Sequence, residues 1–301
     1  MRLLHLDSGR EMRGGQWQVL YLLEGLAACG HSCVLLARSG SPLFEEAVAR
    51  GLDVRPLAAL TVARLSRCYD LTHAHDARSH TLAAAFARSP LVVSRRVAFP
   101  VQSGLLSRWK YSRPMHFIAV SQYVRDMLRS ANVKGGLVSV VYDGVPYPDD
   151  IVPLAERLRH VVAQDTADRA KGADLVRQAA QISRINIVFS KQLPDDLRRA
   201  AVFACITRSE GLGSAVLLAM AAGTPVVASR TGGLPEIIEH QVSGLLTENE
   251  PGEIAGAIRR LLDDPALAAS LAAHARAQVR DRFSLSNMVA GTLSVYERIL
   301  R

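Results

Sequence analysis

The sequence has few cysteines, few aromatic residues and no long apolar run. Its four cysteines show no Cys-x-x-Cys spacing and lie within apolar stretches, as is typical of buried thiols in a reducing compartment. No stretch reaches about 18 uninterrupted apolar residues, so we expect no membrane-spanning helix. Charge at Arg2 and Asp7 comes too early for a secretory signal. We therefore expect a cytoplasmic protein.

The composition is that of an ordinary globular protein. Hydrophobic residues make up 49% and charged residues 21% of the 301 residues, which excludes disordered, collagen-like and low-complexity proteins. A chain of this length corresponds to about two domains.

Positive charge is in excess and is unevenly spread. Lys and Arg number 36 against 28 Asp and Glu, and nine basic residues between Arg88 and Lys134 accompany a single acid, Asp126. Such a segment favours an anionic partner, which is a phosphate group, a nucleic acid or an acidic membrane surface.

Short apolar runs alternate with helical patterns along most of the chain. Strands are predicted at residues 3–7, 33–37, 54–56, 71–75, 91–94, 117–120 and 138–142, and then at 161–163, 185–189, 202–207, 226–229 and 244–246. This alternation predicts an α/β fold with mostly parallel sheets and helices on both faces. Three prolines and three acids at 143–153 indicate a linker. We predict domains at 1–145 and 146–284, the second smaller, and a helix at 285–301 that returns to the first domain.

Two glycine-rich loops in the second half are candidate binding elements. Ser209-Glu210-Gly211-Leu212-Gly213-Ser214 joins a predicted strand to a predicted helix, and Gly232-Gly233 does the same after the next strand. Ligands of α/β domains bind beyond the carboxyl ends of the strands, where glycine allows close approach and helix amides favour an anion. Glu210 then binds sugar hydroxyls beside a phosphate. A tight turn with a solvated glutamate explains the first loop equally well.

These segments resemble glycosyltransferase family 4, a group of retaining enzymes with the GT-B fold. The resemblance rests on 209–213, 219–229, 231–236 and 244–246 and, in the first half, on Gly14-Gly15, His73-Ala74-His75-Asp76 and Ala119-Val120-Ser121. It implies two Rossmann-like, doubly wound parallel-sheet domains with a cleft between them. It also implies transfer of a sugar from a nucleoside diphosphate sugar to an acceptor hydroxyl, with retention of configuration.

The resemblance also implies roles for individual residues. Glu210 is expected to contact the donor sugar and Lys171 the diphosphate, and these two are the catalytic candidates. The other expected donor-binding residues are Gly14, Gly15, Arg169, Gly211, Gly213, Ser214, Ala215 and Leu218. Similar enzymes need no divalent metal, and the sequence has no Asp-x-Asp motif, so we expect no metal and no cofactor beyond the donor. Positive groups must then neutralise the leaving diphosphate.

Three features depart from the family pattern. Leu218 replaces the second acid of the Glu-x7-Glu motif, which in similar enzymes holds the ribose hydroxyls. Asp165 and Thr166 stand where a basic residue is expected before Lys171. Only residues 173–195 separate the lysine loop from the next helix, where similar enzymes have a further strand and helix. This shortening predicts an exposed sheet edge or an opened nucleotide pocket.

Two features of the first half keep more than one interpretation. His73 and His75 point to the same side of a strand, so they are polar strand-end residues, line an acceptor pocket or, with further ligands, bind a metal. Similar enzymes have a histidine near the reacting sugar where this chain has Arg96. Arg96 either holds an anion or belongs to the basic surface. His75 and Arg96 are our acceptor or cleft candidates.

Apolar and basic residues interleave at 95–113. Phe99, Leu105, Leu106, Trp109 and Tyr111 alternate there with Arg108, Lys110 and Arg113. The segment either lies on an anionic membrane, where lipid-linked acceptors reside, or packs on the domain as a partly buried helix.

The function expected from these patterns is sugar transfer to a glycan or lipid-linked acceptor in cell-envelope biosynthesis, in the cytoplasm or at the inner face of the membrane. The alternative is a catalytically degenerate GT-B protein that binds a nucleotide sugar or a partner without turnover. Nucleic acid is not an expected partner, because no nucleic-acid module is recognisable. A dinucleotide dehydrogenase does not fit, because the loop after the first strand lacks Gly-x-Gly-x-x-Gly.

Overall fold

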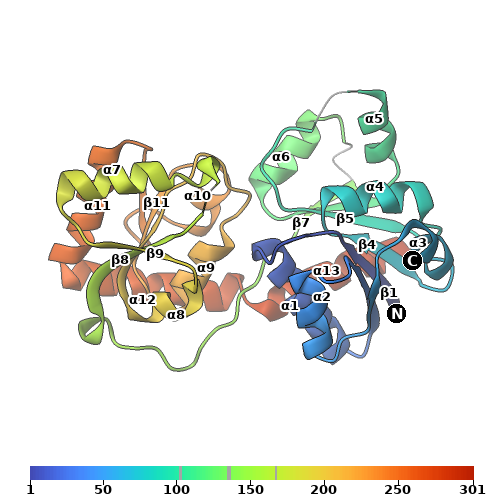
Figure 1. Cartoon of the computed structure of the whole chain (residues 1–301), viewed down its shortest axis with the longest axis horizontal. Coiled ribbons are helices and arrows are strands. Elements are labelled where there is room, and N and C mark those ends of the chain that lie inside the picture. The colour runs from blue at the N-terminus through green and yellow to red at the C-terminus, as the bar shows by residue number, and fades with distance from the viewer. Residues whose placement is uncertain (102–103, 134–136, 167) are drawn as a thin grey trace. The chain divides into compact units, whose positions relative to one another are not determined.

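The computed structural model describes residues 1–101, 104–133, 137–166 and 168–301. The chain forms two compact units (Figure 1), of which unit 1 comprises Met1–Gly144 and Leu285–Arg301 and unit 2 comprises Val145–Ser284. Each unit is built on a parallel sheet. The α/β fold with two parallel-sheet domains is confirmed, whereas the expected cleft between the domains stays a prediction.

The sheet of unit 1 has seven parallel strands among the described residues, in the order β3-β2-β1-β4-β5-β6-β7. They are β1 (Arg2–Asp7), β2 (Ser32–Ala37), β3 (Val54–Pro56), β4 (Leu71–Ala74), β5 (Leu91–Arg95), β6 (His116–Ala119) and β7 (Val138–Val140). All coincide with predicted runs, because strands covered on both faces are apolar throughout. The strand order reverses between β1 and β4, and ligands of such sheets bind at the carboxyl ends there.

The helices of unit 1 cover its sheet. They are α1 (Gly14–Ala28), α2 (Pro42–Ala49), α3 (Ala59–Leu65), α4 (Ala77–Phe86), α5 (Leu105–Ser112), α6 (Gln122–Ser130) and α13 (Leu285–Leu300). Leu22 and Leu26 of α1 share one hydrophobic cluster with Val289 and Tyr296 of α13 and with strand residues such as Leu3. Helix α13 thus completes the core of unit 1.

Helix α5 lies in the stretch for which the sequence predicted only an irregular basic segment or, alternatively, a partly buried helix. It has no buried residue, and Leu105 and Leu106 are 83% and 82% exposed. Tyr111 at its end is half-buried and stacks on the buried Phe117, with ring centroids 5.6 Å apart, so α5 is partly buried there, whereas its two leucines face solvent. Residues 102 and 103 of the 95–113 segment, and Lys134, lie outside the described residues.

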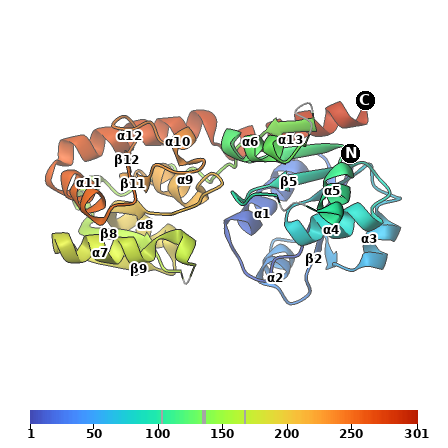
Figure 2. The same ribbon diagram turned by 90° about the horizontal axis from the view of Figure 1, so that it is seen from above.

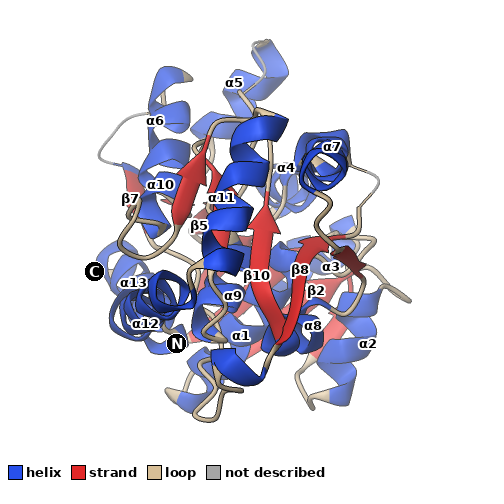
Figure 3. Cartoon of the chain, turned by 90° about the vertical axis from the view of Figure 1, so that its left-hand side faces the viewer, coloured by secondary structure: helices blue, strands red, loops and turns tan. Residues whose placement is uncertain are grey.

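Unit 2 has five parallel strands among its described residues, in the order β12-β11-β10-β8-β9. They are β8 (Leu158–Gln164), β9 (Ile187–Ser190), β10 (Ala200–Cys205), β11 (Val226–Ser229) and β12 (Leu245–Thr247), and Figure 3 shows β8 beside β10. The helices are η2 (Leu154–Glu156) and η3 (Arg169–Lys171), both 3-10, and α7 (Ala173–Ser183), α8 (Leu193–Arg199), α9 (Ser214–Ala221), α10 (Leu234–Ile237), α11 (Pro251–Asp263) and α12 (Pro265–Arg282).

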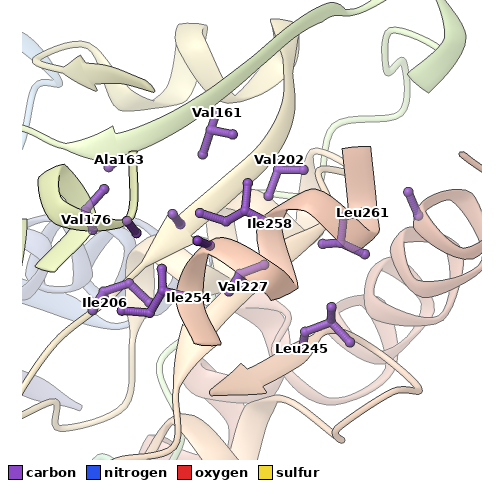
Figure 4. Packing of buried hydrophobic residues seen from close by; sticks show 14 of the residues in the cluster. Val161, Ala163, Val176, Val202, Ile206, Val227, Leu245, Ile254, Ile258 and Leu261 are labelled. Atoms are coloured by element: carbon purple, nitrogen blue, oxygen red, sulfur yellow. The ribbon is translucent and has the colours of Figure 1, made fainter. Parts of the chain in front are cut away.

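The main hydrophobic cluster of unit 2 lies between its sheet and helices α7, α11 and α12. Val161 and Val202 of the strands contact Val176 of α7 and Ile254 and Ile258 of α11 in one cluster (Figure 4). The shortened segment 173–195 still holds α7 and β9, and β9 forms one edge of the sheet. This edge is short, at four residues, which limits pairing with another chain.

The chain passes between the units twice. It leaves unit 1 after Gly144 and returns after Ser284, where α12 of unit 2 is followed by α13 of unit 1 (Figure 2). The two passages are adjacent, because the amide of Val145 donates to the carbonyl of Phe283 at 3.0 Å. None of the helices in the described part of the chain has the length and apolar character to cross a membrane.

Candidate functional site

Lys171 and Glu210 form an ion pair at the carboxyl end of the unit 2 sheet. Lys171 Nζ lies 2.6 Å from Glu210 Oε2, and the side chains are 33% and 16% exposed. Lys171 ends η3 after β8, and Glu210 follows β10. Because β8 and β10 are parallel neighbours, their following loops meet at the same edge of the sheet. The structure therefore brings together the two residues that the sequence marked as catalytic candidates.

The electrostatics of this pair favour a charged lysine. Burial alone would lower the pKa of Lys171, but the charge of Glu210 and its hydrogen bond outweigh burial, so the pKa lies above its ordinary value. Lys171 is thus a cation paired with Glu210 at a partly exposed site, and it can transfer this interaction to a phosphate. A carboxylate next to it can accept hydrogen bonds from hydroxyl groups.

Two glycine-rich loops pack backbone against backbone beside the ion pair. The amide of Gly233 donates to the carbonyl of Glu210 at 3.1 Å. A side chain at Gly232 would collide with the carbonyl of Glu210, and one at Gly233 with that of Gly211. Gly232 also has a φ of +58°, which favours glycine. The glycines are therefore required for the two strand ends to form one surface.

The N-terminus of α9 contributes amide groups to the same edge. Gly213, with φ +113°, precedes the helix, and within the described chain the amides of Ser214 and Ala215 have no acceptor. Leu218 lies three to four residues further, on the face of α9 that Ser214 and Ala215 also occupy, and all three are only half-buried. The exposed face of α9 thus offers amides at its start and an apolar side chain one turn later.

Two arginines flank the lysine loop. Arg169 is exposed, and its carbonyl accepts a hydrogen bond of 2.7 Å from Arg208 Nη1. Arg208 also pairs with Asp174 at 2.7 Å, which helps to lower the pKa of Asp174 to about 2. Sequence reasoning missed Arg208, although it stands only two residues before Glu210. Its backbone amide also donates to the carbonyl of Ala170 at 2.7 Å, so Arg208 holds the loop that carries Lys171.

In unit 1, Arg96 lies beside the first turn of α1. A Cβ at Gly15 would lie 3.8 Å from Arg96 Cδ, and Gly14 begins the helix. Arg96 Nε donates to Asp143 Oδ1 at 3.1 Å, and Nη1 lies 3.3 Å from His75 Nδ1. The side chain of Arg96 is only 14% exposed, so of its two interpretations the basic surface is wrong. Asp143, which sequence reasoning assigned to the linker, is buried in this contact.

Three histidines, His5, His73 and His75, form a buried cluster next to Arg96. His73 and His75 do point to the same side, with ring centroids 4.1 Å apart. His73 Nδ1 bonds the hydroxyl of Tyr296 at 2.6 Å and its Nε2 bonds Ser94 at 2.8 Å, while His75 Nε2 lies 2.9 Å from His5 Nδ1. Nitrogen atoms of the three histidines lie within 4.8 Å of one another, which is compact enough for a metal. Their engagement in hydrogen bonds, next to the charge of Arg96, fits polar packing better. His75, at 6% exposed, is nearly buried rather than open to an acceptor.

Asp7 is a further buried acid at the carboxyl end of β1. It is 1% exposed and accepts hydrogen bonds from the amide of Gly9 at 2.8 Å and from Gln16 Nε2 at 3.2 Å. Burial, and next the charge of Asp76, raise its pKa to about 6. Sequence reasoning missed both Asp7 and His5, although polar residues inside an apolar strand are a signal of a buried network. Such shifted groups gather at functional sites.

Family comparisons cover most of the chain. A family model described as Glycosyltransferase Family 4 matches residues 12–147, and a model described as Glycosyl transferases group 1 matches residues 149–264. The two models thus meet where the chain passes from unit 1 to unit 2.

Individual relatives agree with these models. A D-inositol 3-phosphate glycosyltransferase of Acidothermus cellulolyticus is 41% identical over 120 residues, which is 38% of this chain and 26% of that protein. An alpha-maltose-1-phosphate synthase of Mycolicibacterium smegmatis is 31% identical over 157 residues, or 50% and 38% of the two chains. The chain thus matches less than half the length of these curated relatives.

Solved structures extend the likeness to the whole fold. The crystal structure of Anabaena Alr3699/HepE in complex with UDP has a TM-score of 0.85 and 18% identity, covering 99% of this chain and 100% of that chain. Two parallel-sheet α/β units of this kind define the GT-B glycosyltransferase fold. Residues 12–147 thus resemble the family 4 model and residues 149–264 the group 1 model, and the two units together have the GT-B fold.

Proposed function

We propose that this chain transfers a sugar from a nucleoside diphosphate sugar to an acceptor hydroxyl, with retention of configuration and without a divalent metal. The observation that carries the proposal is the Lys171–Glu210 ion pair beside the glycine loops and the N-terminus of α9. The Anabaena protein with the same fold has been solved with UDP and with UDP-glucose, which supports a donor of this class.

The proposed roles follow from the chemistry of each group. In the reaction the bond between the anomeric carbon and the phosphate oxygen breaks, and a bond to the acceptor oxygen forms on the same face of the sugar. Lys171 and the amides of Ser214 and Ala215 stabilise the charge of the departing diphosphate. Glu210 orients the donor sugar through its hydroxyls. The acceptor proton passes to the leaving phosphate oxygen, so no protein base is needed.

Other donor contacts are proposed around this centre. Gly211 and Gly213 carry no side chain, which lets the donor approach the backbone of the loop closely, and Arg169 adds positive charge. Leu218 cannot accept a hydrogen bond from the ribose. Losing one such bond to a charged group costs about 1.5–3 kcal/mol, or roughly 10- to 100-fold in affinity, so donor binding is weakened without being abolished.

The proposed acceptor is a glycan or lipid-linked molecule at the inner face of the membrane. Helix α5 exposes Leu105, Leu106 and Trp109 and also carries Arg108. An exposed apolar and basic surface of this kind suits the headgroup region of an anionic bilayer. We therefore propose a cytoplasmic protein with peripheral membrane contact, active in cell-envelope glycan or glycolipid synthesis.

Binding and turnover of donors test the proposal. Thermal unfolding is measured with UDP-, GDP- and ADP-sugars, because a ligand at 100-fold above its Kd adds about 2.7 kcal/mol of apparent stability. Transfer or hydrolysis of the selected donor is then followed in Lys171→Met and Glu210→Gln. We expect about 100-fold lower turnover in each, with unchanged melting temperature without donor. Lys191→Met, which removes an 84% exposed lysine from the same unit, is the control.

The outcomes separate the two candidate functions. Binding of a sugar nucleotide without turnover supports the degenerate GT-B protein. The presence of Leu218 in place of the second acid of the Glu-x7-Glu motif favours this alternative. Wild-type turnover in both variants, or no binding of any donor at millimolar concentration, contradicts the proposed enzyme.

A further inference from the structure

The hydrogen bonds of Arg96 fix the protonation of the histidine next to it. A guanidinium has only donors, so His75 Nδ1, 3.3 Å from Arg96 Nη1, must accept and carries no proton. Burial lowers the pKa of His75 well below its ordinary value, and the neighbouring positive groups lower it further. A neutral His75 without a proton on Nδ1 carries it on Nε2.

The same reasoning extends to the next ring. His75 Nε2 lies 2.9 Å from His5 Nδ1, and the rings are nearly parallel, at 9°, with centroids 5.2 Å apart, which is compatible with a hydrogen bond between the two nitrogens. Since His75 Nε2 donates, His5 Nδ1 accepts, and the proton of neutral His5 lies on its Nε2. His5 is fully buried, and in the described chain this Nε2 has no partner. A buried N–H group without an acceptor lowers the stability of the fold, so its presence here calls for a functional reason.

Two anchors therefore hold the guanidinium of Arg96. Asp143, which is buried, accepts from Nε, and His75 accepts from Nη1. Within the described chain Nη2 has no partner. Arg96 lies against Gly15, in the first turn of α1, at the carboxyl end of the sheet. A cation held at two of its nitrogens, with donors to spare beside the first turn of a helix, is organised to bind an anion.

We propose that Arg96 binds a phosphate group of the substrate, and that His75 and His5 are positioning residues that hold Arg96 for this task. The phosphate as ligand rests on the proposed function, whereas the positioning by His5 and His75 does not. His73 is outside this chain of bonds, because both of its nitrogens bond to other partners, Tyr296 and Ser94. The three histidines thus have two separate roles. His5 and His75 hold Arg96, whereas His73 links α13 to β4.

The first test reads the tautomers directly. Ring nitrogen and carbon chemical shifts of His5 and His75 are measured by NMR in the full chain from pH 5.5 to 8. We expect both rings neutral, with the proton on Nε2, throughout this range. A proton on Nδ1 of His75, or titration of His75 within the range, overturns the positioning assignment.

The second test uses substitutions that keep or remove single acceptors. Asn places its amide oxygen close to the position of Nδ1 in His, so His75→Asn keeps the acceptor for Arg96 and loses only the bond to His5. We expect UDP to bind His75→Asn within about threefold of wild type. His75→Leu and Arg96→Met should each lose about tenfold or more, as the loss of a charge-assisted hydrogen bond predicts. Melting temperatures show whether each variant is folded.

A double-mutant cycle isolates His5. His5→Leu should weaken UDP binding severalfold in the wild-type background and have no effect in the His75→Asn background, where no Nε2 remains to be held. A purely structural role of His5 would give equal losses in both backgrounds and would overturn the proposal. Equal losses in His75→Asn and His75→Leu would do the same.

The experiments distinguish failure of the Arg96 proposal from failure of the proposed function. Wild-type UDP affinity in Arg96→Met removes the phosphate assignment of Arg96 and leaves the proposed function intact. If the wild-type chain binds neither UDP nor inorganic pyrophosphate, that assignment and the proposed function both fail, and NMR still decides the positioning by His5 and His75.

Discussion

Asp7 shows how a single buried group carries a pH dependence. Its pKa rises from 3.8 to about 6 in the folded chain, chiefly through burial. The protonated form is thus favoured by folding, and this contribution to stability is full below pH 4 and is lost as the pH rises through 6. A shift of about two pKa units corresponds to roughly 3 kcal/mol at most.

We expect Asp7→Asn to remove this dependence. The side-chain amide of Asn resembles the protonated acid and stays neutral at every pH. The change in unfolding free energy caused by Asp7→Asn should therefore be about 1–3 kcal/mol more favourable at pH 8 than at pH 4. Urea unfolding at both pH values measures the difference, with the exposed Asp150→Asn as control. An equal effect of Asp7→Asn at the two pH values contradicts the expectation.

Residues of the site were predictable from the sequence only where a local pattern marks them. Glu210 was found because it stands in a glycine-rich loop at a strand end, and Lys171 because it matches the phosphate-binding lysine of the family that the sequence resembles. His5, Asp7 and Asp143 were missed, because their roles come from contacts between segments far apart in the sequence. His5 meets His75 across 70 residues, and Arg96 meets Asp143 across 47. No spacing rule predicts such pairs.

At the scale of elements, the two glycine loops depend on backbone contact rather than on side chains. We expect Gly233→Ala to destabilise unit 2 by about 1–3 kcal/mol, because its Cβ would meet the carbonyl of Gly211 and force the loops apart. Donor affinity should fall with it, since Glu210 lies in the displaced loop. Chemical unfolding and donor titration measure the two effects.

Gly256 of α11 is the matched control. A Cβ at this position meets nothing within 4 Å. Gly256→Ala should therefore stabilise the helix by about 0.5–1 kcal/mol and leave donor affinity unchanged. If Gly233→Ala behaves like Gly256→Ala, the close packing of the loops is not required.

Helices and strands were predictable from the sequence where their burial produces a run or a regular spacing of apolar residues. The strands of both sheets are apolar runs and were all anticipated. Helix α5 was only one of two interpretations of its segment, because its exposed leucines leave it without a continuous buried stripe, and such a helix has little signature in hydrophobic periodicity.

For the whole molecule, the surface of α5 gives a testable consequence for location. We expect the protein to sediment with vesicles of phosphatidylglycerol but not of phosphatidylcholine, and to be released by high salt, which screens the charges. The double variant Leu105→Ser, Leu106→Ser should bind about tenfold or more weakly, through lost apolar burial. Leu60→Ser, which changes a 68% exposed leucine of α3, is the control. Equal sedimentation of both variants contradicts a role for α5.

The return of the chain to unit 1 has a consequence for biosynthesis. Tyr296 reaches His73 across 223 residues, and α13 fills the core that α1 and the first strands begin. Domains usually fold in the order in which the ribosome makes them. Here the lobe that starts first lacks its closing helix until all of unit 2 has been translated. Unit 2 is one continuous segment and can reach its native state before unit 1. Until α13 has been made, the apolar surface of unit 1 that it covers stays exposed in the nascent chain.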